Sequence, residues 1–240
     1  MSDFSVVDAP CPGCGETVAA GVALSLNATR HPWAKAQILA GEFHQAECTA
    51  CGLEFTVDHP FLYSDMDRMQ LVQVYTLEQR EDWPELERLT QELYHETILQ
   101  GPAEVQGLMP LFHLRTSFGL AEFCEKLRLW EADLNDAVVE LMKMELLLSQ
   151  PVLQTCPTLE LTVTKVSLDD RQLEVTCWDR QGEFDTRWFG SSLDRYDELM
   201  DHEDDLHERY PNLFVAPYRS FRRLATEVSE HVKITGGEAK

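Results

Sequence analysis

Two short cysteine motifs near the N-terminus constrain the fold of this chain more than any other feature. Cys11-Pro-Gly-Cys14-Gly and Cys48-Thr-Ala-Cys51-Gly share one design, in which two thiols three positions apart are followed by a glycine. Such thiols point to one side only if the backbone turns tightly between them, and the glycine can take the positive φ that ends the turn. Four thiolates are the ligand set of a tetrahedral zinc site. The spacing therefore predicts a zinc ribbon with one structural ion held by Cys11, Cys14, Cys48 and Cys51.

Two other chemistries use paired cysteines. Four thiolates also suit an iron centre of the rubredoxin type, so iron stays the alternative metal. A redox dithiol fits the pattern less well, because the thioredoxin-like Cys-x-x-Cys motif is single and opens a helix within a βαβ unit. When protein thiolates fill all four positions, a metal ion keeps no open position for water, so the predicted role of the site is structural.

The composition is that of a folded and strongly acidic protein. Apolar residues make up 44% of the chain, and 42 Asp and Glu against 20 Lys and Arg give a formal charge of −22. Nucleic-acid affinity rests largely on Lys and Arg, so this charge argues against a nucleic-acid-binding ribbon. The sequence opens without a basic and apolar leader, and no stretch is apolar over a membrane-spanning length. These features predict a cytoplasmic protein with no membrane partner.

The length and the hydrophobic pattern predict an α+β fold in two parts. A chain of 240 residues is compatible with two modest domains. Gln150-Pro151 marks the predicted boundary, because prolines flank a segment without a clear period. We expect a β-rich zinc-ribbon domain with helices at residues 1–149, followed by a smaller, acidic α+β domain at residues 150–240.

Alternating apolar residues predict strands in both parts, and apolar residues at helical spacing predict helices. In the first part, the predicted strands are 17–26, 53–57, 61–63, 70–75 and 111–118, and the predicted helices are 34–40, 83–100, 120–130 and 134–148. Asp133 is the predicted N-cap of the last helix. In the second part we expect strands at 159–168, 171–178 and 183–189, helices at 192–208 and 218–232, and a frayed tail at 236–240.

The residues around the cysteine motifs carry a family resemblance to the bacterial CpXC domain family. The resembling segments are Cys11-Pro-Gly-Cys14-Gly, Gly41-Glu-Phe-His-Gln-Ala-Glu-Cys48-Thr-Ala-Cys51-Gly, Pro60-Phe-Leu-Tyr63-Ser-Asp65-Met, Phe118-Gly-Leu-Ala-Glu122 and Asp133-Leu-Asn-Asp136. The resemblance covers residues 1 to about 148. One departure is Thr49, where the family name implies proline. The resemblance implies a zinc-binding bacterial domain and supplies no activity.

Other polar residues near the motifs have plainer structural interpretations. His44 and His59 lie close to the cysteines in sequence, but four thiols already complete a site, so we expect supporting or surface positions. Tyr63, Asp65 and Asp67 would offer a phenol and two carboxylates to a binding site. A turn that caps the next strand accounts for the same three residues and is the simpler prediction.

These observations favour a non-enzymatic zinc protein that binds another protein or has a regulatory role. The predicted metal site is closed, and no P-loop, dinucleotide-binding, nucleophile-elbow or haem-attachment motif occurs in the sequence. The alternative is an enzyme with an unidentified site between the two domains, built on Tyr63, Asp65 and the Arg219–Arg223 cluster. That cluster otherwise predicts ion pairs with the acidic helix before it. The apolar run Leu141–Leu148 fits either a core or a homodimer seam, so the oligomeric state stays open.

Overall fold

A computed structural model describes most of the chain. The described residues are 2–100, 106–107, 111–155, 158–179 and 185–226. Helices and strands both run through the chain, so the fold class is α+β, as predicted. No helix in these ranges is both long enough and apolar enough to cross a membrane.

By internal packing the chain divides into two compact units, Met1–Cys124 and Glu125–Lys240. This division falls within helix α4 (Gly119–Glu131) and not in a linker. The predicted domain boundary between residues 149 and 150 stays a prediction.

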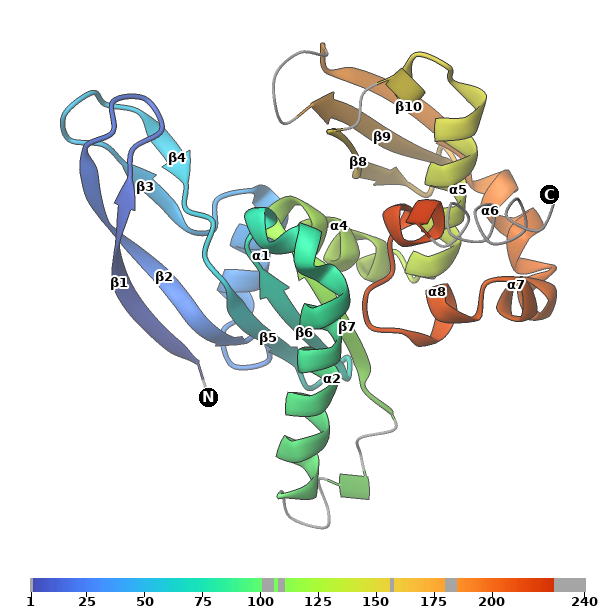
Figure 1. The fold of residues 1–240 in the computed structure, drawn as a ribbon, viewed down its shortest axis with the longest axis horizontal. Coiled ribbons are helices and arrows are strands. Elements are labelled where there is room, and N and C mark those ends of the chain that lie inside the picture. The colour runs from blue at the N-terminus through green and yellow to red at the C-terminus, as the bar shows by residue number, and fades with distance from the viewer. Residues whose placement is uncertain (1, 101–105, 108–110, 156–157, 180–184, 227–240) are drawn as a thin grey trace, which may run out of the picture. The chain divides into compact units, whose positions relative to one another are not determined.

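The first unit is built on a five-stranded sheet with the strand order β1-β2-β5-β6-β7. Its strands are β1 (Asp3–Pro10), β2 (Thr17–Asn27), β5 (Phe61–Asp65), β6 (Gln70–Tyr75) and β7 (His113–Phe118). The pairs β2–β5 and β6–β7 are parallel, and the other two pairs are antiparallel. A separate ladder joins β3 (Gln45–Glu47) to β4 (Glu54–Thr56). Figure 1 shows the β1–β2 hairpin projecting from the sheet, with the β3–β4 pair beside its tip.

The helices of this unit are α1 (Pro32–Ala40), the 3-10 helix η1 (Leu77–Asp82), α2 (Trp83–Leu99) and the start of α4. The predicted strands and helices of the first part match these elements to within about two residues at their ends. Neither β1 nor β3 is predicted from the sequence pattern. In β1 the reason is that apolar residues occur on both faces, since Phe4 and Val6 are 46% and 70% exposed whereas Ala9 is 7% exposed.

An aromatic core packs against the sheet. Phe61 and Tyr63 stand at alternate positions of β5 and therefore share one face, and they are 1% and 0% exposed. The ring of Phe123, from the start of α4, lies 5.5 Å from the Phe61 ring and 4.9 Å from the Tyr63 ring, measured between centroids. β5 itself pairs with β2, the strand that follows the first cysteine turn.

The second unit has a three-stranded antiparallel sheet with the order β10-β9-β8. Its elements after α4 are α5 (Asp136–Ser149), the 3-10 helix η3 (Leu153–Thr155), β8 (Leu159–Ser167), β9 (Gln172–Asp179), β10 (Arg187–Ser192), α6 (Leu193–Met200), α7 (Glu203–Arg209) and α8 (Pro211–Val215). Inward side chains of the sheet, including Leu161 and Val175, join one apolar cluster with Val138 of α5 and Leu193 of α6. The predicted hairpin is confirmed. The third strand is Arg187–Ser192, later in the chain than the predicted 183–189, of which residues 183–184 lie outside the described ranges.

The start of α5 differs from the prediction. Its N-cap is Asn135, whose side chain accepts a hydrogen bond from Ala137 N at 3.0 Å. Asp133, the predicted cap, has a φ of 54°. A residue in this left-handed conformation ends the turn after α4 and does not begin the next helix.

The single helix predicted at 192–208 is two helices. α6 buries Leu193, Tyr196 and Leu199 at one-turn intervals, whereas α7 buries no residue. Without an apolar stripe, α7 has no reason to continue along the same face of the core. The helix predicted at 218–232 begins at residue 221, and the part after 226, like the tail 236–240, lies outside the described residues.

Candidate metal centre

The two cysteine turns have the same backbone hydrogen bonds. In the first, Cys11 N donates to the carbonyl five residues later at 2.8 Å, and Gly15 N donates to Cys11 O at 2.8 Å. In the second, Cys48 N donates to the carbonyl five residues later at 2.9 Å, and Gly52 N donates to Cys48 O at 2.7 Å. Gly15 and Gly52 have φ values of 76° and 72°. Both glycines thus take the positive φ predicted from the sequence, which costs glycine little.

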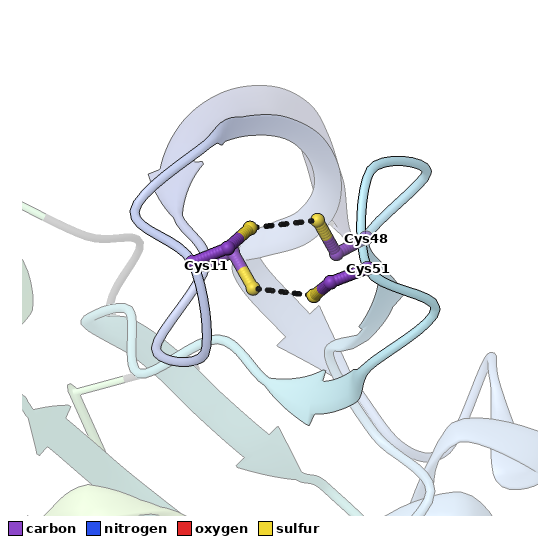
Figure 2. Close-up of side chains that lie close together, drawn as sticks. Cys11, Cys48 and Cys51 are labelled. Atoms are coloured by element: carbon purple, nitrogen blue, oxygen red, sulfur yellow. Dashed lines mark hydrogen bonds between the residues drawn. The ribbon is translucent and has the colours of Figure 1, made fainter.

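Two hairpins bring the turns together. The first turn joins β1 to β2, and the second joins β3 to β4. Cys11 Sγ lies 3.6 Å from Cys51 Sγ, and Cys14 Sγ lies 3.6 Å from Cys48 Sγ. All four sulfur atoms lie within 4.8 Å of one another. Figure 2 shows Cys11 facing Cys48 and Cys51 across the gap between the two loops.

The spacing of these sulfur atoms fits a tetrahedral metal ion. Four ligands at about 2.3 Å from a central ion lie about 3.8 Å from each other. The two close sulfur pairs, at 3.6 Å, and the 4.8 Å limit on all pairs agree with that geometry. A disulfide would instead bring two sulfur atoms to about 2.0 Å, and the four cysteines are free.

The four thiols differ in exposure and in acidity. Cys11 and Cys48 are buried, whereas Cys14 and Cys51 are exposed. Burial raises the pKa of Cys11, but hydrogen bonds from the backbone of Cys14 and Gly13 and from the Cys51 and Cys48 thiols lower it to about 7. A backbone hydrogen bond lowers the pKa of Cys14, but the Cys48 and Cys51 thiols and burial raise it to about 12. Ionising one thiol thus opposes ionisation of the next, and a divalent cation would relieve this repulsion.

Neither histidine near the motifs belongs to this thiol cluster. His44 is 6% exposed, and its Nε2 accepts a hydrogen bond from Ala23 N at 2.9 Å. Its ring stacks on Phe43 at 4.1 Å and meets Phe61 edge-on at 5.3 Å, between centroids. His44 therefore ties β2 to the aromatic core, which is a supporting position, as predicted.

We expect the neutral ring of His44 to make the stability of the protein depend on pH between about 6.5 and 4. Burial lowers the pKa of His44 from 6.5 to about 4, with a smaller contribution from His59. The unfolded chain takes up the proton near pH 6.5, whereas the folded chain does not. The free energy of unfolding is therefore highest above pH 6.5 and falls as the pH is lowered towards 4. Urea unfolding at pH 7.5 and pH 5 measures this fall.

The matched variants for this experiment are His44→Gln, which keeps a hydrogen-bond acceptor, and His202→Gln, whose side chain is 73% exposed. Protonation of the cysteines affects both variants alike, so the difference between them isolates His44. We expect a smaller loss of stability at pH 5 in His44→Gln. Equal losses in the two variants would contradict the role given to His44.

The second cysteine turn has Thr49 where the first has Pro12. Because the two turns share their hydrogen bonds and their glycine conformation, proline fits at residue 49 as it does at residue 12. Proline restricts the unfolded chain, so Thr49→Pro is expected to raise the free energy of unfolding by about 0.4–1 kcal/mol, and Pro12→Thr to lower it by a similar amount. Chemical denaturation measures both. A destabilised Thr49→Pro variant would show that the turns are not equivalent.

Asp65, the last residue of β5, acts as a turn cap. Asp65 Oδ1 accepts hydrogen bonds from Asp67 N and Arg68 N at 3.2 Å, and Oδ2 pairs with Lys35 Nζ at 3.0 Å. Tyr63 is fully buried in the aromatic core. These contacts confirm the simpler prediction, a turn that caps the next strand. The enzymatic alternative built on these residues stays a prediction.

The arginines near the C-terminus are engaged in ion pairs and hydrogen bonds. Arg219 Nη1 lies 3.1 Å from Asp136 Oδ1, and Arg222 Nη2 lies 3.2 Å from Glu160 Oε1. Ion pairing is predicted from the sequence, but the expected partner, the acidic helix before the cluster, is wrong. The partners lie on α5 and β8, because the chain between α8 and residue 221 turns back onto those elements.

Sequence reasoning missed a buried ion-pair network centred on Glu140 of α5. Its Oε1 accepts hydrogen bonds from Lys126 Nζ at 2.8 Å and Lys143 Nζ at 3.0 Å, and its Oε2 accepts one from Phe221 N at 2.8 Å. Lys143 also pairs with Glu125. The four charged side chains are at most 3% exposed. The available signal was that Glu140 and Lys143, at one-turn spacing, interrupt the apolar stretch between Ala137 and Met144.

The comparison with known families confirms the family resemblance predicted from the sequence. Searches of the curated proteins and of the solved structures find no match to the chain. The family model described as CpXC protein matches residues 9–143, which is more than half of the 240 residues. The match contains both cysteine turns and extends into α5. The chain therefore belongs to the CpXC protein family.

Proposed function

We propose that this chain is a non-enzymatic zinc protein, in which a structural zinc ion holds two hairpin tips together and the folded surface binds another protein. The observation that carries the proposal is the set of four thiol sulfur atoms within 4.8 Å of one another. The residues that would hold the ion are Cys11, Cys14, Cys48 and Cys51. With four protein ligands, a zinc ion has no open position at which to activate water, which favours a structural role.

The region around the thiols has little other means of holding its shape. β3 and β4 are three residues long each. The apolar cluster around them has only four buried members, Ala9, Ala20, Val22 and Val57, against which the partly buried Val7, Ala46 and Phe55 pack. Small side chains bury little apolar surface, so they contribute little to stability. A bound ion would supply the missing constraint, because zinc binding in small domains is itself folding free energy.

Metal analysis of the full chain, purified from its native host without chelators, tests the metal assignment. We expect about one zinc ion per chain in the protein and none in Cys11→Ser. Cys177→Ser, which removes a buried thiol outside the cluster, should keep the ion. Iron in place of zinc, visible by its thiolate absorption, would overturn zinc and keep the four ligands.

The proposed binding role follows from acidity and from the absence of catalytic motifs in the sequence. A formal charge of −22 favours partners with basic surfaces and opposes nucleic acid. We also infer a cytoplasmic location, where free thiols persist. Affinity capture from the native host, followed by reconstitution with the purified partner, tests the role. Turnover of a defined substrate that is lost on mutating one carboxylate would overturn the non-enzymatic assignment.

A further inference from the structure

The outer strand of the five-stranded sheet has one open edge. β1 pairs with β2 through all of its residues, Asp3–Pro10. In the described ranges no strand pairs with its other side, because β1 ends the order β1-β2-β5-β6-β7. A strand directs half of its backbone N–H and C=O groups to each side. An edge of this length therefore presents a row of groups that another strand can pair with.

An exposed aromatic cluster adjoins this edge. Phe4 of β1 stacks on Trp33 of α1 at 6.2 Å between centroids, with an interplanar angle of 20°. His31 meets both rings edge-to-face, at 6.0 Å and 5.9 Å. Phe4 is 46% and Trp33 is 51% exposed. Val6, 70% exposed, lies two positions after Phe4 on the same face of the strand.

We call the edge of β1 together with Phe4, Val6, His31 and Trp33 the β1 surface. Ordered and exposed aromatic residues next to an apolar position are typical of protein interfaces, where tryptophan and its neighbours carry much of the binding energy. The rings already contact each other, so binding would need little reordering of these side chains. The β1 surface thus combines the open edge of a strand, to which another strand can hydrogen-bond, with an exposed apolar cluster that can anchor a side chain of the partner.

The charge around the β1 surface specifies the partner. Asp3 and Asp8 are exposed near the two ends of β1, and the first Lys or Arg in the chain is the exposed Arg30, which precedes His31 and lies outside the strand. The β1–β2 hairpin therefore carries carboxylates and no cation. Opposite charges across neighbouring strands are favourable, and like charges are not. A second copy of the chain would bring the same aspartates and a formal charge of −22, so a basic partner fits better.

We propose that the β1 surface binds an extended segment of another protein, rich in apolar and basic residues, which adds to the sheet as a strand beside β1. Main-chain hydrogen bonds along β1 would hold the segment, as in other cases of strand addition. An apolar side chain of the segment packs against Phe4 and Trp33, and Lys or Arg residues lie near Asp3 and Asp8. This inference rests on the proposed protein-binding function and names its surface.

The test uses the full metal-loaded chain and two labelled peptides. One peptide alternates valine and lysine and contains a central phenylalanine, and the other has glutamate in place of every lysine. We expect fluorescence anisotropy to show binding of the lysine peptide, with the glutamate peptide at least about tenfold weaker. Hydrogen exchange with the lysine peptide present should slow at amides of β1.

Two variants locate the contact. The double variant Phe4→Ser/Trp33→Ser removes the apolar anchor. Val6→Lys places a positive charge, the same sign as the lysines of the peptide, at an exposed position and leaves the core unchanged. Each is expected to weaken binding of the lysine peptide by at least about tenfold. The matched control is Trp188→Ser, which removes a tryptophan that is 65% exposed in the second unit and should leave binding unchanged.

In the anisotropy experiment, the inference is overturned if the lysine peptide does not bind, if it still binds both variants, or if only Trp188→Ser abolishes binding. In the hydrogen-exchange experiment, it is overturned if the peptide protects amides away from β1 instead. Dimerisation that disappears in Phe4→Ser/Trp33→Ser would replace the partner with a second copy. A natural partner that still binds this double variant would refute the surface and leave the proposed protein-binding function intact. Absence of any natural partner would refute that function itself.

Discussion

Replacing Cys48 by serine is expected to abolish metal binding and to unfold the tip of the first unit. Cys48 is 0% exposed, and its Sγ lies 3.6 Å from that of Cys14. A serine hydroxyl does not replace a thiolate as a zinc ligand. Zinc binding in zinc-finger peptides is linked to folding by about 10–16 kcal/mol at pH 7. Even part of this free energy is more than the small side chains beneath β3 and β4 can supply by packing.

The unfolding should be local. Phe61, Tyr63 and Phe123 form their core without the thiols, so β5, β6 and β7 are expected to stay folded. Hydrogen exchange of the full chain measures this: amides of the two cysteine turns and of β3 and β4 should lose protection, while those of β5 and β6 keep it. A chelator added to the unmodified protein should give the same pattern.

Cys177→Ser is the control for this prediction. Cys177 is also 0% exposed, but it lies in β9 of the second unit and outside the thiol cluster. We expect this variant to keep both the ion and the protection of the cysteine turns. If Cys48→Ser keeps full metal content, or if the turns stay protected after chelation, a structural metal site is contradicted.

The features that sequence alone predicted are those fixed by neighbouring residues. Each cysteine turn depends on a few successive positions, and Gly15 and Gly52 supply the positive φ that the turn needs. The alternating strand β6 and the amphipathic helix α2 are likewise local patterns. β1 escaped prediction because its apolar residues lie on both faces, with Phe4 and Val6 exposed and Ala9 buried, so they do not alternate along the strand.

The buried network of the second unit escaped for a different reason. Glu140 and Phe221 are far apart in the sequence but share a hydrogen bond. Charged residues are read as solvent-exposed unless a partner is known, since an unpaired buried charge is very costly. Only the tertiary structure supplies the partners. The four cysteines were an exception, because the spacing of two Cys-x-x-Cys motifs predicted that they would lie together, and their sulfur atoms are within 4.8 Å of one another.

Removing the carboxylate of Glu140 is expected to lower the free energy of unfolding of the second unit by about 3–5 kcal/mol. Burial raises the pKa of Glu140, but the ammonium groups of Lys126 and Lys143 lower it further, so the net shift is downward and the group is ionised. For the basic Lys143, burial lowers the pKa, but the carboxylates of Glu125 and Glu140 raise it above its usual range. Glu140→Ala leaves these two buried ammonium groups short of negative charge.

Urea unfolding of Glu140→Ala, Glu140→Gln and Glu145→Gln measures the effect. Glu145 lies on the same helix, is 45% exposed and pairs with Arg195, so its loss should cost at most about 1 kcal/mol. Glutamine at 140 keeps an acceptor for Phe221 N but not the charge, and an intermediate loss is expected. A loss of stability that is largest in Glu140→Ala, intermediate in Glu140→Gln and smallest in Glu145→Gln would separate the contribution of the charge from that of the hydrogen bond. Equal stability of Glu140→Ala and Glu145→Gln would show that the network contributes nothing to stability.

Glu140→Ala also tests which contacts hold α5, the last helix of the family match. The family match ends at residue 143, yet Glu140 accepts a hydrogen bond from Phe221 N, and Lys126 Nζ donates to Arg219 O at 2.8 Å. Residues beyond the match therefore complete the bonding of charged groups within it. We expect Glu140→Ala to speed hydrogen exchange at Phe221, which loses its acceptor, more than at β9, which loses only the protection that follows from the lower stability of the unit. Unchanged exchange at Phe221 would mean that apolar packing alone holds the residues around Phe221 against α5.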